Sequence, residues 1–108
     1  MTRVVPDTNI IISSIFWSGQ PYEVIHRGLS DEYQLIISPE ILDEVAERLR
    51  NKFQFPEEGI QNLLDILITY CHLVEPTSRF DVVRDKKDNK IIECAFDGQS
   101  DYIVTGES

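Results

Sequence analysis

Short apolar runs recur along the chain, separated by longer stretches in which apolar residues follow helical spacing. The runs are β-branched or wholly apolar, which is typical of strands that are covered on both faces of a sheet. Proline or small polar residues follow several of the runs, and such residues commonly end strands. The pattern predicts strands at residues 3–5, 35–37, 73–74 and 102–104.

The longer stretches place apolar side chains on one stripe, behind residues that commonly start helices. Asp7-Thr8-Asn9 supplies capping side chains before residues 10–16, which we interpret as a helix, although they could also extend the first strand. Prolines suit the first turn of the second and third helices. The predicted helices cover residues 10–16, 21–28, 39–53, 60–70 and 88–97.

Two of these helices carry more detailed predictions. The stripe on the fourth helix predicts four side chains that face the core, namely Leu63, Leu64, Leu67 and Ile68. The fifth helix has two residues suited to cap its start, Asp88 and Asn89.

Alternating strands and helices with short connections predict an α/β fold, with a mostly parallel sheet and helices on both faces. A chain of 108 residues, 42% of them hydrophobic, suits a single domain over residues 1–108 with one core. We find no run of about 20 apolar residues and no signal sequence, so we expect no membrane segment. Cys71 and Cys94 lie in apolar surroundings, and we expect reduced, buried thiols in a cytoplasmic protein.

Acidic residues fall near the edge of the predicted sheet where the strands end. Sites of open α/β sheets lie outside the C-terminal ends of the strands. Asp7 directly follows the first strand, Glu107 comes after the last, and Asp88 starts the helix that leads to the last strand. We therefore expect these three carboxylates to converge.

Glu44 is the fourth candidate, and it lies within a helix. At about 100° per residue, it sits roughly 60° outside the apolar stripe of that helix. Asp43 and Glu47 point farther from the stripe, so Glu44 is the acidic residue that we expect to turn inward.

Each of these acids also has an ordinary structural interpretation. Helix capping could be the whole role of Asp7 and Asp88. Glu44 could pair with Arg48 on a solvated face, and Glu107 could be an ordinary loop residue. Capping does not explain why all four approach one edge of the sheet, and their joint position favours a site.

Clustered carboxylates repel one another and need a cation. Oxygen ligands suit Mg²⁺ or Mn²⁺, which can activate water and stabilise the leaving oxygen of a phosphodiester. The sequence offers no well-placed histidine as a base. The net charge of -9 opposes nucleic acid at long range, but a bound metal reverses the local sign. A basic partner protein would also suit this charge.

Four segments, VVPDTNI, SPEILDEVAERL, DKKDNKIIECA and SDYIVTGES, closely resemble a PIN domain in this order. The nearest branch is the bacterial and archaeal toxin component of toxin–antitoxin pairs (VapC-like). The resemblance covers almost the whole chain. DTN after a hydrophobic strand is a common pattern, whereas its combination with DNKIIECA and DYIVTG is specific.

The resemblance implies a three-layer α/β/α fold and Mg²⁺- or Mn²⁺-dependent cleavage of single-stranded RNA. It also implies an antitoxin protein as partner and a homodimer. By the match of the motifs, the catalytic and metal-binding carboxylates are Asp7, Glu44, Asp88 and Glu107, with Asn9 and Thr105 in support.

The sequence departs from the family pattern in two places. Glu107 stands where members usually carry Asp. Family members commonly continue with another acidic residue, a helix and a final strand, which these 108 residues do not include. We therefore interpret the chain as a C-terminally truncated PIN-like domain.

Other functions remain open at this point. An inactive PIN-like module that binds a partner protein would also suit the net charge and Glu107. A phosphoryl-transfer domain would need an acid where Asn9 stands. An RNA-binding rim could be formed by Lys86, Lys87 and Lys90, unless they belong to a solvated loop. The face over residues 60–68 suits dimerisation or core packing.

Overall fold

Four parallel strands form the centre of the computed structural model, which describes residues 1–77 and 89–106 in full and the backbone of residues 86–88. The strands lie in the order β3-β2-β1-β4, so β1 and β2 are the inner pair. Val4 is in register with Leu35 on one side and Tyr102 on the other. The strands are β1 (Arg3–Pro6), β2 (Gln34–Ile37), β3 (His72–Leu73) and β4 (Tyr102–Val104). All four predicted strands are confirmed, with shifts of at most one residue at their ends.

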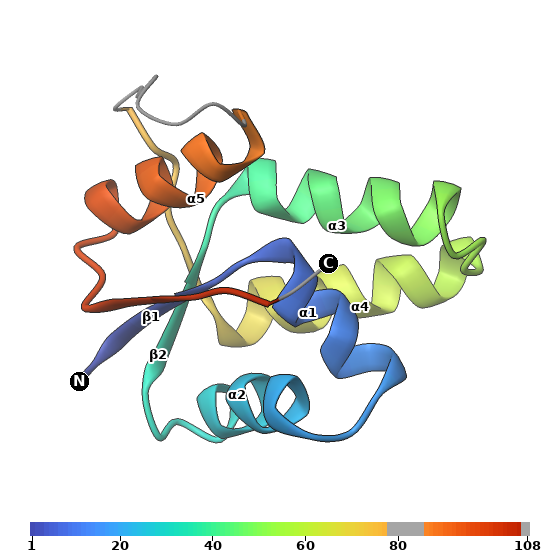
Figure 1. Ribbon diagram of the computed structural model, residues 1–108, viewed down its shortest axis with the longest axis horizontal. Coiled ribbons are helices and arrows are strands. Elements are labelled where there is room, and N and C mark those ends of the chain that lie inside the picture. Colours follow the sequence, from blue (N-terminus) through green and yellow to red (C-terminus); the bar gives the residue numbers. More distant parts are fainter. Residues whose placement is uncertain (78–85, 107–108) are drawn as a thin grey trace.

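Helices lie on both sides of the strands, and Figure 1 shows α5 and α2 on opposite sides. The result is the expected three-layer α/β/α arrangement. The helices are α1 (Thr8–Phe16), α2 (Gln20–Leu29), α3 (Pro39–Asn51), α4 (Glu57–Tyr70) and α5 (Lys86–Asp97). The segment after β1 is therefore a helix and does not extend the strand.

Three helices begin at least two residues earlier than predicted. α1 begins at Thr8 and α4 at Glu57, two and three residues before their predicted starts. α5 begins at Lys86, so Asp88 and Asn89 lie inside its first turns and do not cap it. Lysine is a good helix former, which explains why the helix includes residues that were expected in a loop. Asp88 nevertheless remains close to the beginning of α5.

The core lies between the sheet and the helices. Ile36 and Ile37 of β2 are fully buried, as are Val45 and Leu49 of α3. Both cysteines are buried free thiols, as expected. Burial raises the pKa of the Cys71 thiol to about 12 and that of the Cys94 thiol to about 11, so both remain protonated near neutral pH.

The prediction for α4 was wrong at one position. Ile60 and Leu67 are buried, and Leu63 and Leu64 are half-buried, but Ile68 is 50% exposed. α4 packs mainly on α3, so it buries a narrow stripe instead of a broad face. Over the described part of the chain, every helix falls short of the length and apolar character that a membrane span requires.

The packing of α2 on β2 leaves no room for a methyl group at Gly28. A Cβ added there would stand 2.4 Å from Cγ of Leu35, a side chain that is 1% exposed. Alanine normally stabilises a helix more than glycine does. We nevertheless expect Gly28→Ala to lower the free energy of unfolding by about 1–3 kcal/mol, because overpacking forces the buried leucine to shift. Urea denaturation followed by circular dichroism measures this change.

Gly59→Ala in α4 is the matched control. Its added Cβ would meet ring atoms of Phe55, at 2.6 Å for the closest, and this half-buried ring can turn aside. We expect the stability of this variant to equal or exceed that of the wild type. Equal losses in the two variants would contradict the packing argument.

Candidate functional site

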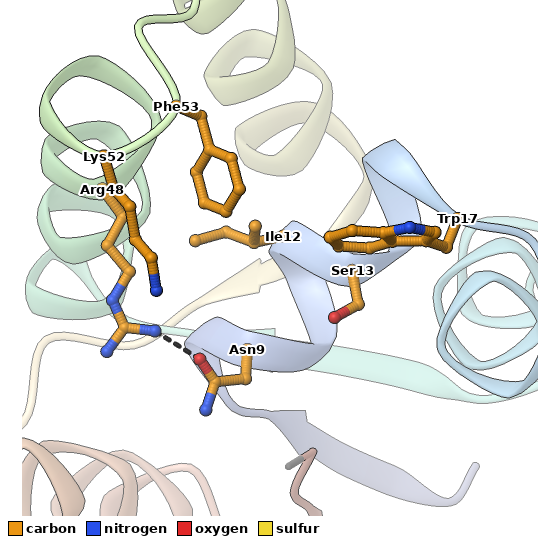
Figure 2. A pocket seen from close by; sticks show the side chains of 7 residues that line it. All are labelled: Asn9, Ile12, Ser13, Trp17, Arg48, Lys52 and Phe53. Atoms are coloured by element: carbon orange, nitrogen blue, oxygen red, sulfur yellow. Dashed lines mark hydrogen bonds between the residues drawn. The ribbon is translucent and has the colours of Figure 1, made fainter. Parts of the chain in front are cut away.

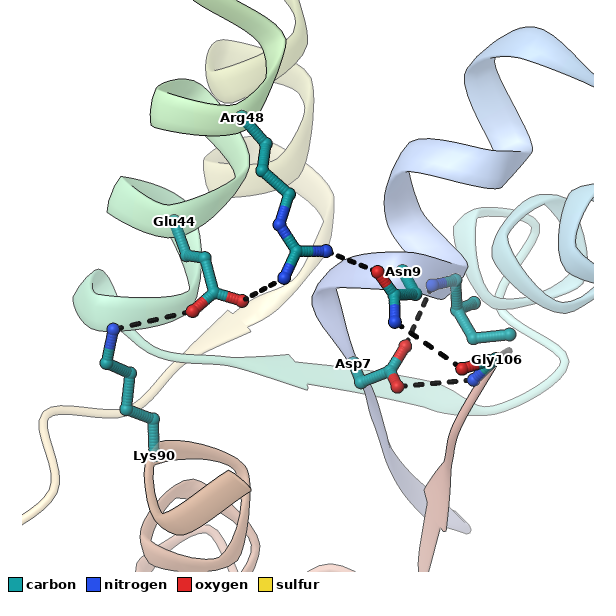
Figure 3. Close-up of polar contacts among 7 residues, drawn as sticks. Asp7, Asn9, Glu44, Arg48, Lys90 and Gly106 are labelled. Carbon is teal, nitrogen blue, oxygen red and sulfur yellow. Dashed lines mark hydrogen bonds and ion pairs between the residues drawn. The ribbon is translucent and has the colours of Figure 1, made fainter. Parts of the chain in front are cut away.

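Asp7 lies where β1 passes into α1. Its Oδ1 accepts a hydrogen bond from the Ile10 amide at 2.8 Å, which caps α1. Its Oδ2 accepts another from the Gly106 amide at 3.2 Å, and its own amide donates to the Val104 carbonyl at 2.9 Å. The carboxylate is therefore held by backbone amides on both sides, at the C-terminal edge of the sheet (Figure 3). Asp7 does cap α1, and the same geometry places it where sites of such sheets occur.

Asn9 connects three parts of the fold. Its side-chain amide donates to the Gly106 carbonyl at 3.5 Å. Its amide oxygen accepts a hydrogen bond from the guanidinium of Arg48 in α3. Asn9 thus joins α1 to the segment after β4 and to α3.

Glu44 turns inward, as its position on α3 predicted. Its side chain is 11% exposed, whereas Asp43 and Glu47 are exposed. One carboxylate oxygen lies 3.6 Å from the Arg48 guanidinium, and the other lies 3.5 Å from Nζ of Lys90. The pair with Arg48 that the alternative interpretation offered is therefore present, but the two side chains are only 24% and 11% exposed and do not form a solvated face.

These contacts form one polar network across α1, α3 and α5. Figure 3 shows Asn9 and Arg48 lying between Asp7 and Glu44. The two carboxylates are thus separated by an amide and a guanidinium, and the guanidinium compensates the charge of Glu44. Among the residues that the structure describes, no group of three His, Cys, Asp or Glu side chains is placed to hold a metal ion.

An open cavity of about 420 Å³ lies beside Asp7. Polar groups of Asp7, Asn9 and Thr105 face an apolar wall from α5 and β4. The lining residues are Asp7, Asn9, Ile91, Ile92, Ile103, Thr105 and Gly106. Thr105, which was predicted to support the site, thus lines the same cavity.

The predicted site residues fall into three groups. The network brings together Asp7, Asn9, Glu44 and Lys90, and Thr105 lines the cavity. Lys86, Lys87 and Asp88 lie at the start of α5, with side chains outside the described part. Glu107 lies outside the described residues altogether. The donor set that the structure does describe consists of carboxylate and amide oxygens, which are the ligands that Mg²⁺ and Mn²⁺ prefer.

Sequence reasoning missed the bond between Arg48 and Asn9 and the aromatic group around Trp17. The i+4 spacing from Glu44 indicated that Arg48 could turn inward as well, but nothing in the sequence placed Asn9 opposite it. Trp17 directly follows α1 and is 59% exposed. It is the only tryptophan of the chain, and the composition alone distinguishes this residue.

The fold and the position of Asp7 define a three-layer α/β/α protein with an acidic residue at the C-terminal edge of its sheet. A family model described as PIN domain matches residues 3–108. "Uncharacterized protein MJ1680" of Methanocaldococcus jannaschii is 30% identical over 111 residues, which cover 97% of this chain and 70% of that protein. The comparison with solved structures gave no significant match. The chain belongs to the PIN domain family, a family of nucleases.

Two arginines of α3 are expected to contribute unequally to stability, because only one of them belongs to the polar network. Replacing Arg48 by Met keeps an apolar stem but removes the cation between Asn9 and Glu44. We expect Arg48→Met to lower the free energy of unfolding by roughly 1–3 kcal/mol, because two half-buried oxygen atoms lose a partner. Urea denaturation at neutral pH measures the loss.

Arg50→Met provides the control, two residues farther along α3. Arg50 pairs with Glu57 at 2.8 Å, but the two side chains are 48% and 58% exposed. Exposed ion pairs contribute little to stability. We therefore expect a clearly smaller loss, and identical unfolding midpoints for the two variants would show that the network does not contribute more than a surface pair.

Proposed function

We propose that this protein is a metal-dependent endoribonuclease that cleaves single-stranded RNA, and that it is the toxin of a toxin–antitoxin pair. One observation carries the proposal. Asp7 is oriented by backbone amides at the C-terminal edge of the sheet, on the wall of an open cavity. Membership of a family of nucleases supports the same chemistry.

The residues that would hold Mg²⁺ or Mn²⁺ are Asp7, Glu44, Asp88 and Glu107. Such an ion, when bound, supplies an activated water and a positive charge for the leaving oxygen. Of the protein's own groups, Asn9 positions the residues beside Asp7, and Thr105 lies at the cavity wall. A carboxylate that is already oriented by the backbone loses little freedom when it takes a ligand.

Arg48 and Lys90 have a second role in this proposal. They neutralise Glu44 and bring positive charge to the edge of an acidic site. In a chain with a net charge of -9, such local cations favour the approach of an RNA phosphate. Lys86 and Lys87 lie in the same helix as Lys90 and would extend the basic rim.

A second candidate is a PIN-like module that binds a protein and cleaves slowly or not at all. The observation that favours it is the state of Glu44, since both of its carboxylate oxygens face cations of the protein. A carboxylate in this state is a weaker metal ligand, because a metal must compete with the two ion pairs. The two candidates differ in whether the protein binds a divalent ion.

The same proposal implies two protein partners, an antitoxin and a second copy of this chain. An antitoxin with a basic surface would complement the net charge of -9. Ile66 and Tyr70, four residues apart on one face of α4, are 44% and 58% exposed, and they are suited to the interface of a homodimer. We place the protein in the cytoplasm, where its two thiols stay reduced.

Cleavage should depend on the charge of Asp7. Asparagine caps a helix about as well as aspartate, so Asp7→Asn keeps the cap on the Ile10 amide. It removes the charge, together with the bond that the second carboxylate oxygen accepts from the Gly106 amide. We expect the rate of RNA cleavage in Mg²⁺ or Mn²⁺ to fall by roughly 100-fold or more, since a bound metal lowers the activation free energy by several kcal/mol. Gel analysis of a labelled single-stranded RNA measures the cleavage, and a cooperative thermal transition well above the assay temperature shows that the fold is intact.

Glu44→Gln should reduce cleavage in the same assay, and Asp43→Asn is its matched control. Asp43 is adjacent on α3 but exposed, and its loss should leave the rate near that of the wild type. If Asp7→Asn cleaves as fast as the wild type, the proposed nuclease site is wrong.

Metal binding separates the two candidate functions. We expect isothermal titration with Mn²⁺ to show saturable binding to the wild type and none to Asp7→Asn, because the ion needs the charged oxygen ligand. Asp43→Asn should bind as the wild type does. An absence of binding to the wild type, together with a stable complex with a basic protein, would favour the binding module.

A further inference from the structure

A second cavity lies between α1 and the C-terminal end of α3. Its volume is about 150 Å³. The lining residues, drawn in Figure 2, are Asn9, Ile12, Ser13, Trp17, Arg48, Lys52 and Phe53. Asn9 lines both this cavity and the larger one beside Asp7. A ligand in the second cavity would thus lie next to the acidic site.

One wall of this cavity is aromatic. Trp17 is 59% exposed, an unusual state for such a large apolar ring. Phe16 packs edge-on against it at 5.7 Å between ring centres, and Phe16 stacks on Phe53 at 4.8 Å. The indole is therefore supported by a layer of aromatic rings while much of its surface stays open to solvent.

The opposite wall carries positive charge. Arg48 and Lys52 come from successive turns of α3 and its C-terminal cap, and Figure 2 shows both beside the cavity. Asn9 and Ser13 add polar groups on α1. Proteins that bind single-stranded nucleic acids combine aromatic rings, on which bases stack, with cations that follow the phosphates.

We propose that this cavity binds one unpaired base of an RNA strand, with Trp17 stacking on the base and Arg48 and Lys52 contacting the flanking phosphates. The inference rests on the proposed nuclease function, which it extends by a base-binding subsite. A cavity of about 150 Å³ is large enough for one small aromatic ring but not for several bases. A base within a duplex has no free face to offer, so the subsite selects single-stranded RNA.

Trp17 is the only tryptophan in the chain, so its fluorescence reports on this cavity directly. The experiment titrates the protein with a short single-stranded oligoribonucleotide in the presence of a chelator, which prevents cleavage. We expect saturable quenching by the single strand and little quenching by a duplex of the same length. A strand of the same length without bases should bind through its phosphates but leave the fluorescence unchanged.

Affinity for a dye-labelled strand, measured by fluorescence anisotropy, provides the second readout. Stacking on one aromatic ring predicts that Trp17→Ala weakens binding roughly 5- to 150-fold, and that Trp17→Phe retains most of the affinity. Tyr22→Ala is the matched control. Tyr22 is 40% exposed and stacks on His26 in α2, outside the cavity, so its loss should not change the affinity.

The contribution of the cation wall is tested by Lys52→Gln. Loss of one phosphate contact on a single strand should lower the slope of log affinity against log salt by about 0.7. Lys52 is exposed at the end of α3, so this variant is expected to fold normally.

Binding without quenching, or equal affinities for Trp17→Ala, Trp17→Phe and the wild type, would overturn the proposal. Quenching by a basic protein but not by RNA would overturn it in favour of a protein-binding surface. The quenching experiment contains a chelator and therefore does not depend on metal-dependent cleavage. A failure of the base-binding subsite would be seen as missing quenching in the presence of the chelator. A failure of the nuclease proposal would be seen only as missing cleavage in the presence of metal, so the two outcomes are distinguishable.

Discussion

The carboxylate of Asp7 is the group on which the rest of the site depends. One oxygen starts α1 by accepting the Ile10 amide, and the other accepts the Gly106 amide beyond β4. The direction of α1 and the course of the chain after β4 are thus both set by one side chain at the end of β1. These bonds also fix the rotamer of the carboxylate, so a group that completes the fold is presented to the cavity in a defined orientation. Its capping role and its proposed catalytic role are consequences of the same two bonds.

Charge compensation is the second constraint. Partly buried carboxylates destabilise a fold unless cations or hydrogen-bond donors accompany them. Arg48 and Lys90 meet this need for Glu44, and Asn9 extends the network from Arg48 to Gly106. In an acidic protein, this arrangement also concentrates positive charge where a phosphate would approach. The interactions that stabilise Glu44 in the fold are therefore also part of the proposed RNA-binding edge.

The sequence predicted all four strands and all five helices because their signals are local: β-branched runs, capping residues and prolines at first turns. It also predicted that Glu44, and not Asp43, turns inward, since that depends on helical period alone. The starts of α1, α4 and α5 were placed too late, and in α5 the helix-forming residues Lys86 and Lys87 extend the helix toward its N-terminus. Ile68 was misjudged because its exposure depends on how many neighbours α4 has, which is a tertiary property. The bond between Arg48 and Asn9 spans 39 positions and needed the packing of α3 on α1 to be known.

Asn9 lies between the segment that Asp7 holds and the Arg48 guanidinium, and its amide is chemically suited to this position. It donates through nitrogen to the Gly106 carbonyl and accepts through oxygen from Arg48. An aspartate could not donate to the carbonyl and would add a further negative charge close to Asp7. A residue with the same shape as aspartate but no charge therefore connects the acidic cavity to the aromatic one. Asn9 lines both cavities, so in the proposed complex a base held against Trp17 and a phosphate near Asp7 would lie on either side of this one residue.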